Sequence, residues 1–314
     1  MLFEEHAAKT LLAAAGITVP TSQLVSTASE AVDAVRRIGT CVIKAQVPTG
    51  KRGKSGGIVT VDQSSAVHDV ADQLLGMDIA GYRANTLLVE ARVSVATELY
   101  TAIVNDQRTQ GPLLLFSSRG GIDIEETIEA YPDDLARLPI DIRKGIDNAS
   151  LEALVTPSVP AAALAPVCDA LQQLYQAYVD NDAELLEINP LAITDDNAVV
   201  ALDCKFTLDD SALVRQTELN RKGRPEPLTA LEVRGQSLGL RFIEFDGSVG
   251  VLANGAGLTM TTMDAVRHYG GQPANFLEIG GEAYTLGEAA LELVLSHPNV
   301  KSLLVNLCGA FART

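Results

Sequence analysis

Apolar and polar residues alternate along the chain in patterns that predict both helices and strands. Apolar residues at helical spacing predict helices over residues 7–15, 29–38 and 161–179, with Ser29 as a candidate N-cap of the second. Short apolar runs, bounded by Gly and polar residues, predict strands over 41–47, 58–61, 87–90, 99–104 and 113–116.

A β-hairpin is predicted over residues 184–205, because two apolar runs flank the turn sequence Asp195-Asp196-Asn197. With the turn centred near Asp196, Asn189 is expected opposite Asp203. Side chains alternate along a strand, so Glu187 is expected on the same face as Asn189.

The pattern changes beyond residue 239. Strands over 249–253, 275–279 and 302–306 alternate with helices near 259–268 and 286–295, which predicts a parallel βαβαβ sheet. The polar segment 220–226 resembles a linker. We therefore expect an α/β protein with domains at 1–235 and 239–314. The third strand is expected to leave an exposed edge, since the chain stops where another helix is expected.

Composition narrows the classes of function. Forty acidic residues against 24 basic ones give a net charge of −16, which argues against binding to nucleic acid or to anionic membranes. Two Glu precede the first apolar stretch, unlike a signal peptide, and no apolar run approaches the roughly 18 residues of a membrane span. The four cysteines form no CxxC pair, which is typical of a reduced protein. We therefore expect a cytoplasmic location.

A basic, glycine-rich segment follows the strand at 41–47. Lys44 lies inside this otherwise apolar strand, and Lys51, Arg52 and Lys54 follow in a loop that contains Gly53. Four cations, and a backbone that can approach closely, favour a phosphate site, although the Walker spacing is missing. A solvated basic turn is the alternative, and a Lys inside an apolar strand favours the phosphate site.

Acidic residues supply a second set of candidates. Glu187, Asn189 and Asp203 offer the oxygen ligands that Mg²⁺ prefers, and Mg²⁺ typically takes one or two carboxylates and leaves its other positions to water and phosphate. Ordinary polar residues on the wet face of a hairpin are the alternative. Glu90 and Glu98, at the ends of two strands, are candidates for contacts with a nucleotide, or are solvated strand termini.

Gly-containing loops follow each of the last three strands, at 253–257, at 280–281 and at Gly309. Ligands bind at such carboxyl ends in open α/β sheets, so these loops predict an anion or carboxylate site, with plain turns as the alternative. None of the four histidines lies in a recognisable catalytic pattern, and no Ser or Cys nucleophile motif is present.

Eight segments together resemble, in order, the β subunit of succinyl-CoA synthetase, and the related malate–CoA ligase β subunits are similar. They are IKAQVPTGKRGKSGG, LLVEARVSVATELY, SSRGGIDIEE, LLEINPLAIT, ALDCKF, NGAGLTMTTMD, GGQPANFLEIGG and LLVNLCGAF, and they cover essentially the whole chain. The resemblance implies an ATP-grasp domain followed by a flavodoxin-like domain that is C-terminally incomplete here.

The same resemblance implies a ligase that joins a small succinate- or malate-like acid to CoA, driven by ATP or GTP. The family reaction passes through an acyl phosphate and a phosphohistidine. The phosphorylated histidine belongs to an α-type subunit that also binds CoA, which agrees with the lack of a catalytic histidine pattern here.

Site residues follow from the matched motifs. By resemblance, Lys44 and the stretch Lys51, Arg52 and Gly53 bind ATP phosphates, whereas Glu90, Val93 and Glu98 contact the nucleotide. Asn189 and Asp203 hold Mg²⁺, and Glu187 stabilises the phosphohistidine at the ATP site. The acid-substrate site would contain Asn254, Ala310, Phe311 and Ala312.

The chain departs from the family pattern in three places. Pro48 and Thr49 stand where the family usually has a small residue or His, and Glu282 replaces the third Gly of a Gly-Gly-Gly motif. The family's Gly-Gly-Ile-Val-Arg stretch is Gly-Ala-Phe-Ala-Arg at 309–313, and the helix that it opens is missing. The last two departures leave the identity of the acid open.

Two other functions remain open at this point. One is a nucleotide-binding scaffold or regulatory subunit without turnover, for which the reading frame beyond Thr314 is the discriminating observation. The other is a stand-alone ATP-grasp ligase that forms amide bonds, which leaves the Gly loops of the second domain unexplained.

Overall fold

The computed structural model describes residues 1–314 with the exception of 51, 63, 122–123, 125–130, 280–282 and 310–314. The chain divides into two compact units, Met1–Pro225 and Glu226–Thr314, which are described separately. The division falls inside the polar segment 220–226 that resembles a linker in sequence. From the sequence, the first domain is expected to end at residue 235. In the structure, residues 226–235 belong to the second unit.

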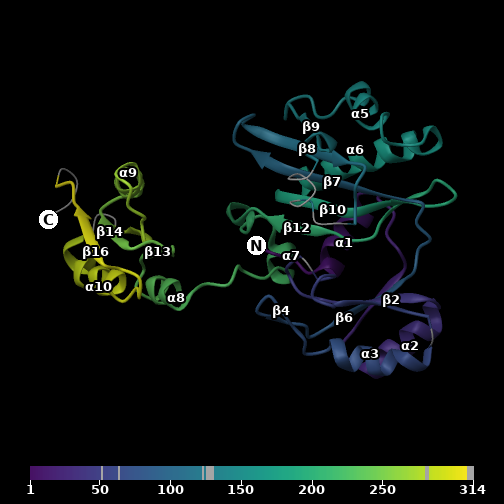
Figure 1. The fold of residues 1–314 in the computed structure, drawn as a ribbon, viewed down its shortest axis with the longest axis horizontal. Helices are drawn as coiled ribbons and strands as arrows, with labels where there is room; N and C mark the ends of the chain where they lie inside the picture. The colour runs from purple at the N-terminus through teal and green to yellow at the C-terminus, as the bar shows by residue number, and fades with distance from the viewer. Residues whose placement is uncertain (51, 63, 122–123, 125–130, 280–282, 310–314) are drawn as a thin grey trace. The chain divides into compact units, whose positions relative to one another are not determined.

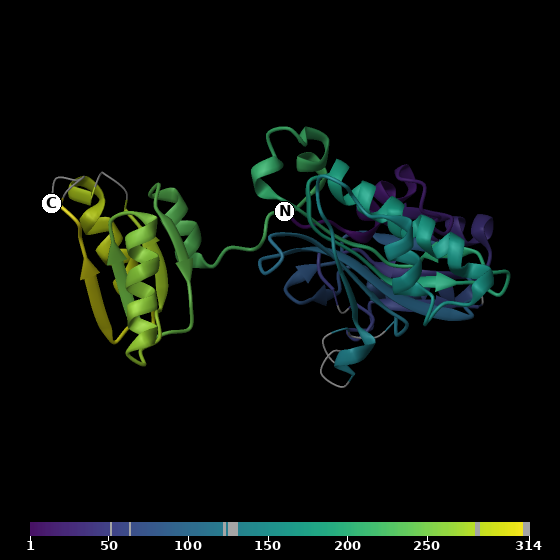
Figure 2. The same ribbon diagram turned by 90° about the horizontal axis from the view of Figure 1, so that it is seen from above.

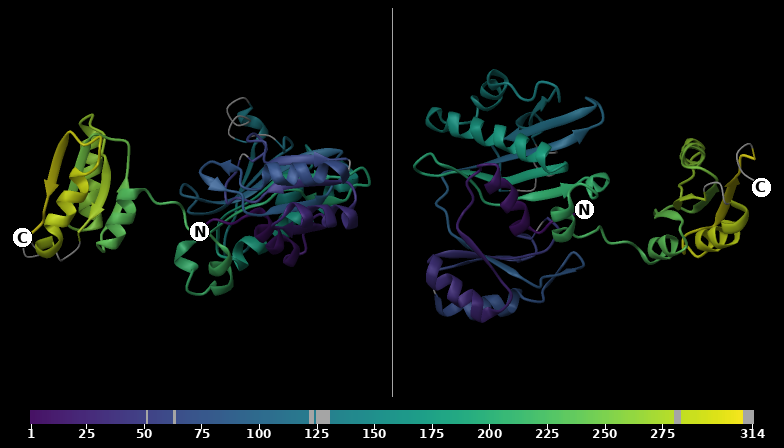
Figure 3. Two further views of the ribbon diagram at one scale, coloured as in Figure 1. Left: turned by 90° about the horizontal axis from the view of Figure 1, so that it is seen from below. Right: turned by 180° about the vertical axis from the view of Figure 1, so that it is seen from behind.

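The first unit contains two lobes, and the small lobe is a four-stranded antiparallel sheet with strand order β1-β6-β2-β3. Two helices cover the face of this sheet that points away from the other lobe (Figures 1 and 3). The bounds are β1 Ser22–Val25, α2 Ala28–Ile38, β2 Cys41–Ala45, β3 Ile58–Val61, η1 Ser64–Ala66, α3 Val67–Leu74 and β6 Leu87–Ala91, with a two-stranded ribbon of β4 Asp78–Ile79 and β5 Tyr82–Arg83.

Thr27, and not Ser29, caps α2. The Thr27 hydroxyl accepts a hydrogen bond from the backbone N–H of Glu30 at 3.2 Å. The helix begins at Ala28, so Ser29 already lies inside the first turn, where its side chain cannot serve as an N-cap.

The large lobe is a six-stranded antiparallel sheet of order β11-β10-β7-β8-β9, in which β12 also pairs with β10. Leu99, Ile103 and Leu186 of the sheet pack against Leu171 and Leu174 of α6. The bounds are α1 Glu5–Ala14, β7 Thr97–Asp106, β8 Gly111–Ser117, η2 Pro132–Asp134, β9 Ala136–Pro139, α5 Asn148–Val155, η3 Ala161–Ala163, α6 Leu164–Asp180, β10 Ala183–Ile193, β11 Val199–Ala201, β12 Lys205–Leu208, η4 Asp210–Ala212 and α7 Thr217–Lys222.

The predicted hairpin is confirmed in its register. Leu191 pairs with Ala201 on one side of the candidate metal ligands, and Glu187 pairs with Lys205 on the other. Asp203 lies in the short segment between β11 and β12, where the strand pairing with β10 is interrupted. The pairs on either side place Asp203 opposite Asn189.

Helix α1 lies between the two sheets (Figure 1). Its apolar residues Ala8 and Leu12 are fully buried in the core of the large lobe. Glu5 and Lys9, on the same helix, instead pair with Lys44 of β2 and Glu90 of β6. The sequence pattern predicts the apolar side of this helix, but the second, charged and buried side depends on the small lobe.

The second unit is a three-layered α/β structure, which confirms the predicted class. Its sheet has the order β13-β15-β14-β16, and two separate cores lie on its opposite faces. Leu252 and Leu277 pack against α10, whereas their chain neighbours Val251 and Phe276 pack against α9, since strand side chains alternate. The bounds are α8 Ala230–Ser237, β13 Arg241–Glu244, β14 Val249–Ala253, α9 Ala256–His268, β15 Asn275–Glu278, α10 Ala283–Leu295 and β16 Ser302–Asn306.

Strand β13 corrects the expectation of an all-parallel sheet. β14 runs parallel to both β15 and β16, as predicted, but β13 is antiparallel to β15. The four residues of β13 are an apolar pair between two charged residues and are too few for a clear pattern. Pairing with β15 makes them a strand. β16 is an edge strand (Figure 2), with Leu304 40% and Val305 46% exposed. No helix in the described part of the chain has the length and apolar run that crossing a bilayer requires.

Candidate active site

A cavity of about 670 Å³ in the first unit brings most of the predicted site residues together, and its volume suits a nucleotide-sized ligand. Its walls come from β2, β6, the loop after β2 and the β10–β12 region. The predicted residues that line it are Lys44, Arg52, Gly53, Glu90, Val93, Glu98, Glu187, Asn189 and Asp203. Lys51, also predicted here, lies outside the described residues.

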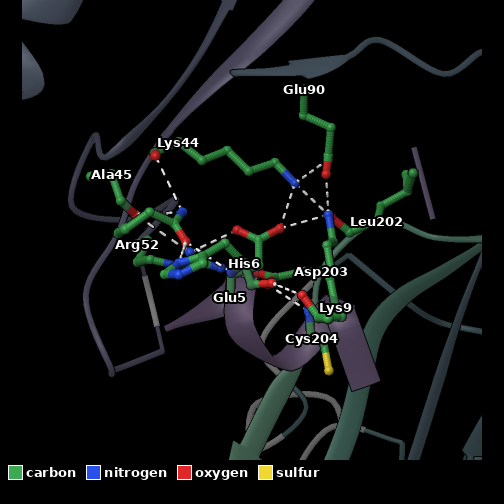
Figure 4. A network of polar contacts seen from close by, with 12 residues as sticks. Glu5, His6, Lys9, Lys44, Ala45, Arg52, Glu90, Leu202, Asp203 and Cys204 are labelled. Carbon is green, nitrogen blue, oxygen red and sulfur yellow. Dashed lines mark hydrogen bonds and ion pairs between the residues drawn. The ribbon is translucent and has the colours of Figure 1, made fainter. Parts of the chain in front are cut away.

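Six charged side chains, which we call the inter-lobe ion cluster, lie together at this cavity: Glu5, Lys9, Lys44, Arg52, Glu90 and Asp203 (Figure 4). All of them except Lys9 line the cavity. Lys44 Nζ lies 2.9 Å from Glu5 Oε1 and 2.6 Å from Glu90 Oε1. Lys9 Nζ lies 2.7 Å from Glu5 Oε1 and also pairs with Glu90 Oε2. Three cations therefore face three carboxylates at the boundary between the lobes.

Two further contacts complete the cluster. Lys44 Nζ and Lys9 Nζ both donate to the backbone carbonyl of Leu202, at 2.6 and 2.8 Å. Arg52 joins the cluster to the hairpin, because its Nη1 lies 2.7 Å from Glu5 Oε2 and its Nη2 lies 2.5 Å from Asp203 Oδ1. The cations of the small lobe are thus held to groups of the large lobe.

The electrostatics explain why buried charges are tolerated here. Burial by itself raises the pKa of Glu5, but Lys44, Arg52 and Lys9 outweigh it and hold the pKa of this carboxyl well below its ordinary value. Burial likewise opposes the charged form of Lys44, and Glu5 and Glu90 raise the pKa of Lys44 above its usual range. Both groups are therefore ionised at neutral pH.

Asp203 and Asn189 are the candidate metal ligands, and both line the cavity. Both hydrogen bonds that the described residues make to the Asp203 carboxylate, from Arg52 and from the backbone N–H of Cys204 at 2.7 Å, end on Oδ1. Asn189 Oδ1 accepts from the backbone N–H of Gly121 at 2.7 Å. One carboxylate and one amide oxygen at a cavity wall fit the donor set of a hydrated Mg²⁺ ion.

Glu187 lines the cavity from β10 and contacts Tyr100 of β7. The Tyr100 hydroxyl donates to Glu187 Oε2 at 3.3 Å, and burial together with the nearby Glu187 charge raises the pKa of Tyr100. Tyr100 consequently stays protonated at neutral pH and orients the Glu187 carboxylate.

The loop after β8 approaches Glu98 closely at Gly121. Gly121 has a φ of +73°, and a Cβ at this position would lie 1.9 Å from Glu98 Oε2. The backbone N–H of the preceding Gly120 donates to the Glu98 carbonyl at 2.9 Å. The SSRGG segment is therefore part of the site, and a side chain at 121 would displace the Glu98 carboxylate from its present place.

The predicted acid-site residue Asn254 lies in the second unit, at the carboxyl end of β14. Its amide bridges to the segment after β16: Nδ2 donates to the Cys308 carbonyl at 2.9 Å, and Oδ1 accepts from the Cys308 N–H at 2.8 Å. The other predicted acid-site residues, Ala310, Phe311 and Ala312, lie outside the described residues, as do Gly280, Gly281 and Glu282.

Sequence reasoning missed Glu5, Lys9 and Tyr100. Glu5 and Lys9 are four residues apart on one helix, a spacing that places both on one side of it, but the apolar pattern of that helix drew attention to its other side. Tyr100 is an ordinary strand residue in sequence, and only the pairing of β7 with β10 brings it to Glu187.

Two lobes around a cavity of cations and carboxylates, followed by an α/β unit, define the ATP-grasp class of ligases. A family model described as an ATP-grasp domain matches residues 2–193, and one described as CoA-ligase matches residues 252–314. The chain belongs to the family of succinate–CoA ligase β subunits. It is 41% identical, over 100% of its length and 83% of the relative's, to the ADP-forming succinate–CoA ligase subunit beta of Natronomonas pharaonis.

Other relatives agree. A protein of the same name from Desulfatibacillum aliphaticivorans is 37% identical over 100% of this chain and 84% of its own length. Among solved structures, ATP citrate lyase from Methanothrix soehngenii, in complex with citrate and coenzyme A, superposes with a TM-score of 0.62 over 97% of this chain and 80% of that chain. Its identity of 22% supports the fold alone.

Proposed function

We propose that the chain is the β-type subunit of an ADP-forming acid–thiol ligase, which converts a carboxylic acid, CoA and ATP into acyl-CoA, ADP and phosphate. The observation that carries this proposal is the cavity in which two buried cations, Lys44 and Arg52, stand beside Asn189 and Asp203. Cations bind phosphates and hard oxygens bind Mg²⁺, so one cavity holds the complementary groups for Mg·ATP.

The phosphates meet Lys44 and Arg52, with Gly53 allowing close approach of the backbone. Glu90, Val93 and Glu98 line the same cavity and are proposed to contact the rest of the nucleotide. GTP is the alternative nucleotide, since nothing in these contacts selects a base. Lys51 is proposed as a further phosphate ligand by its place in the motif.

Asn189 and Asp203 are proposed to hold Mg²⁺. When bound, the ion supplies charge neutralisation to the phosphates in the transition state. Arg52 would then have two roles. It pairs with the metal ligand Asp203, and it lines the cavity in which the phosphates are proposed to bind. The protein therefore places one positive charge next to the metal ligand before any anion arrives.

Glu187 is proposed to accept a hydrogen bond from the phosphohistidine of an α-type partner subunit. Tyr100 holds the Glu187 carboxylate in place, as its hydrogen bond indicates. The same partner is proposed to bind CoA, and the acid site is proposed at Asn254 with Ala310, Phe311 and Ala312. Four free cysteines agree with a reducing, cytoplasmic location.

Reconstitution tests this function. The chain is mixed with its α-type CoA-binding partner, ATP, Mg²⁺, CoA and a panel of dicarboxylates, and thioester formation is followed. We expect a thioester with at least one acid, and its loss in the Lys44→Met variant but not in the control Lys222→Met. No thioester with any acid, under conditions in which a known ligase works, would overturn the proposal and favour a scaffold without turnover.

A further inference from the structure

We propose that Glu5 is a positioning residue of the nucleotide site: its carboxylate holds Lys44 and Arg52 in the places from which they meet the phosphates. The inference rests on the proposed function and deepens it. Glu5 precedes every motif that carries the family resemblance and has no role in it.

The geometry is a two-pronged bridge. Glu5 Oε1 lies 2.9 Å from Lys44 Nζ, and Glu5 Oε2 lies 2.7 Å from Arg52 Nη1 (Figure 4). The two cations come from different backbone segments, Lys44 from β2 and Arg52 from the loop after it. The two oxygens of one carboxylate therefore hold Lys44 and Arg52 separately, which sets the distance between these two cationic groups.

Glu5 is the member of the cluster that performs this bridging. Among the ion pairs between described residues, Glu90 contacts Lys44 but not Arg52, and Asp203 contacts Arg52 but not Lys44. Glu5 contacts both. Without it, two long and flexible side chains would have no common partner, and ordering them on phosphate would cost conformational entropy.

Burial distinguishes Glu5 from the candidate metal ligand Asp203. Its side chain is 0% exposed, whereas the Asp203 side chain is 30% exposed. A carboxylate with no accessible surface acts through Lys44 and Arg52 and not by touching a nucleotide. Glu5 has one further charged neighbour, Lys9, which lies on the next turn of α1. Lys9 Nζ is 2.7 Å from Glu5 Oε1, and this contact holds the Glu5 carboxylate in one orientation.

Glu5 also connects the two lobes at the site. Leu12 of helix α1 is buried in the core of the large lobe, whereas Lys44 belongs to the small lobe. The candidate metal ligands Asn189 and Asp203 belong to the large lobe. The bridge consequently fixes the small-lobe cations relative to the large-lobe metal ligands.

Two substitutions separate position from charge. Glu5→Asp keeps the charge but withdraws the carboxylate by one methylene, so that it cannot reach both cations. Glu5→Gln keeps the reach, but its amide accepts from one cation and turns a donor toward the other. Glu4→Gln is the matched control, since Glu4 precedes Glu5 in the chain and pairs with His6 and Arg224 instead.

Calorimetry measures binding of Mg·ATP to the full-length chain, and thermal unfolding reports folding. We expect Glu5→Asp and Glu5→Gln to fold and to bind Mg·ATP about tenfold or more weakly, and Glu4→Gln to bind like the parent. In the reconstituted ligase, the KM for ATP should rise while the KM for CoA stays unchanged, a split that a general loss of stability would not give.

Folded Glu5→Asp and Glu5→Gln variants with parental affinity for Mg·ATP would overturn the inference. Loss of folding in both variants would also overturn it, because Glu5 would then maintain the fold and not the cations. If the parent chain itself binds no Mg·ATP, the proposed function fails. A parent that binds, beside variants that bind equally well, leaves the proposed function standing and removes only the role of Glu5.

Discussion

Arg52 and Asp203, 151 residues apart in the chain, form an ion pair in which Nη2 lies 2.5 Å from Oδ1. Arg52 is a predicted phosphate ligand from the small lobe, and Asp203 is a predicted metal ligand from the large lobe. Burial opposes the charge of Arg52, but Asp203 and Glu5 raise the pKa of its guanidinium above the usual range. The proposed phosphate site and the proposed metal site therefore share one contact.

We expect Asp203→Asn to weaken binding of Mg·ATP by about tenfold or more, since the amide keeps an oxygen ligand but loses the charge that attracts the metal. Binding of ATP in the presence of a chelator should change little. Calorimetry with and without Mg²⁺ measures the difference. Asp195→Asn, in the hairpin turn, is the control, and equal effects with and without Mg²⁺ would contradict a metal role for Asp203.

Gly121→Ala should weaken the affinity for Mg·ATP while it lowers the free energy of unfolding only slightly. A Cβ at 121 collides with the end of the exposed and flexible Glu98 side chain, which can move aside, and the positive φ costs about 1–2 kcal/mol. Displacement of Glu98 removes a proposed nucleotide contact. Gly287→Ala, a helical position with open space around it, should be neutral or stabilising. Parental affinity for Mg·ATP in Gly121→Ala would exclude Glu98 from the site.

Glu187→Gln should lower the turnover of the reconstituted ligase and leave the affinity for Mg·ATP near the parental value. The amide no longer stabilises a charged imidazole ring, whereas the phosphate and metal ligands are untouched. Tyr100→Phe removes the hydrogen bond that orients Glu187 and should give a smaller loss of kcat. Quenched-flow measurement of phosphohistidine formation on the partner subunit follows this step. A parental rate in Glu187→Gln would refute the assignment.

Asn254→Asp should raise the KM for the acid substrate without changing that for ATP. Aspartate accepts the Cys308 N–H but cannot donate to the Cys308 carbonyl, so the segment after β16 loses one of two contacts. Because the hydrogen bonds to Cys308 are exposed, the second unit should lose only about 1 kcal/mol of stability. Steady-state kinetics across acid concentrations, beside the control Asn299→Asp, test this. A change in the KM for ATP would instead indicate a long-range effect on the first unit.

The acid stability of the first unit should depend on Glu5. Since the folded-state pKa of Glu5 lies below its ordinary value of 4.5, its stabilisation is complete above that pH and is lost as the pH falls toward the folded-state value. Glu5→Gln lacks this titration. Its free energy of unfolding should be lower by about 3 kcal/mol at pH 7, and should change less between pH 5 and about pH 3. Urea denaturation at a series of pH values measures how the free energy of unfolding of the parent and of Glu5→Gln changes with pH. Equal pH dependence in the two proteins would contradict a lowered pKa of Glu5.

Much of the fold follows from local pattern. The strands at 58–61, 249–253 and 302–306 have the predicted bounds, and the hairpin register follows from one turn sequence. Strand β13 does not, because its four residues depend on a neighbour for their conformation. The boundary between the units is likewise set by the packing of α8 against β13, which no local pattern contains.

The class of protein, the motifs and the residue types of the site follow from the sequence, because spacing and chemistry are local properties. The sequence placed Lys44 and Arg52 on a strand and the loop after it, and Asn189 opposite Asp203 on a hairpin, and the family resemblance assigned them to phosphate and metal. That all four residues line one cavity, with Glu5 buried beside Lys44 and Arg52, depends on the tertiary structure. The physical reason is that a buried charge is stable only beside opposite charges, and those neighbours come from strands and helices far apart in the chain.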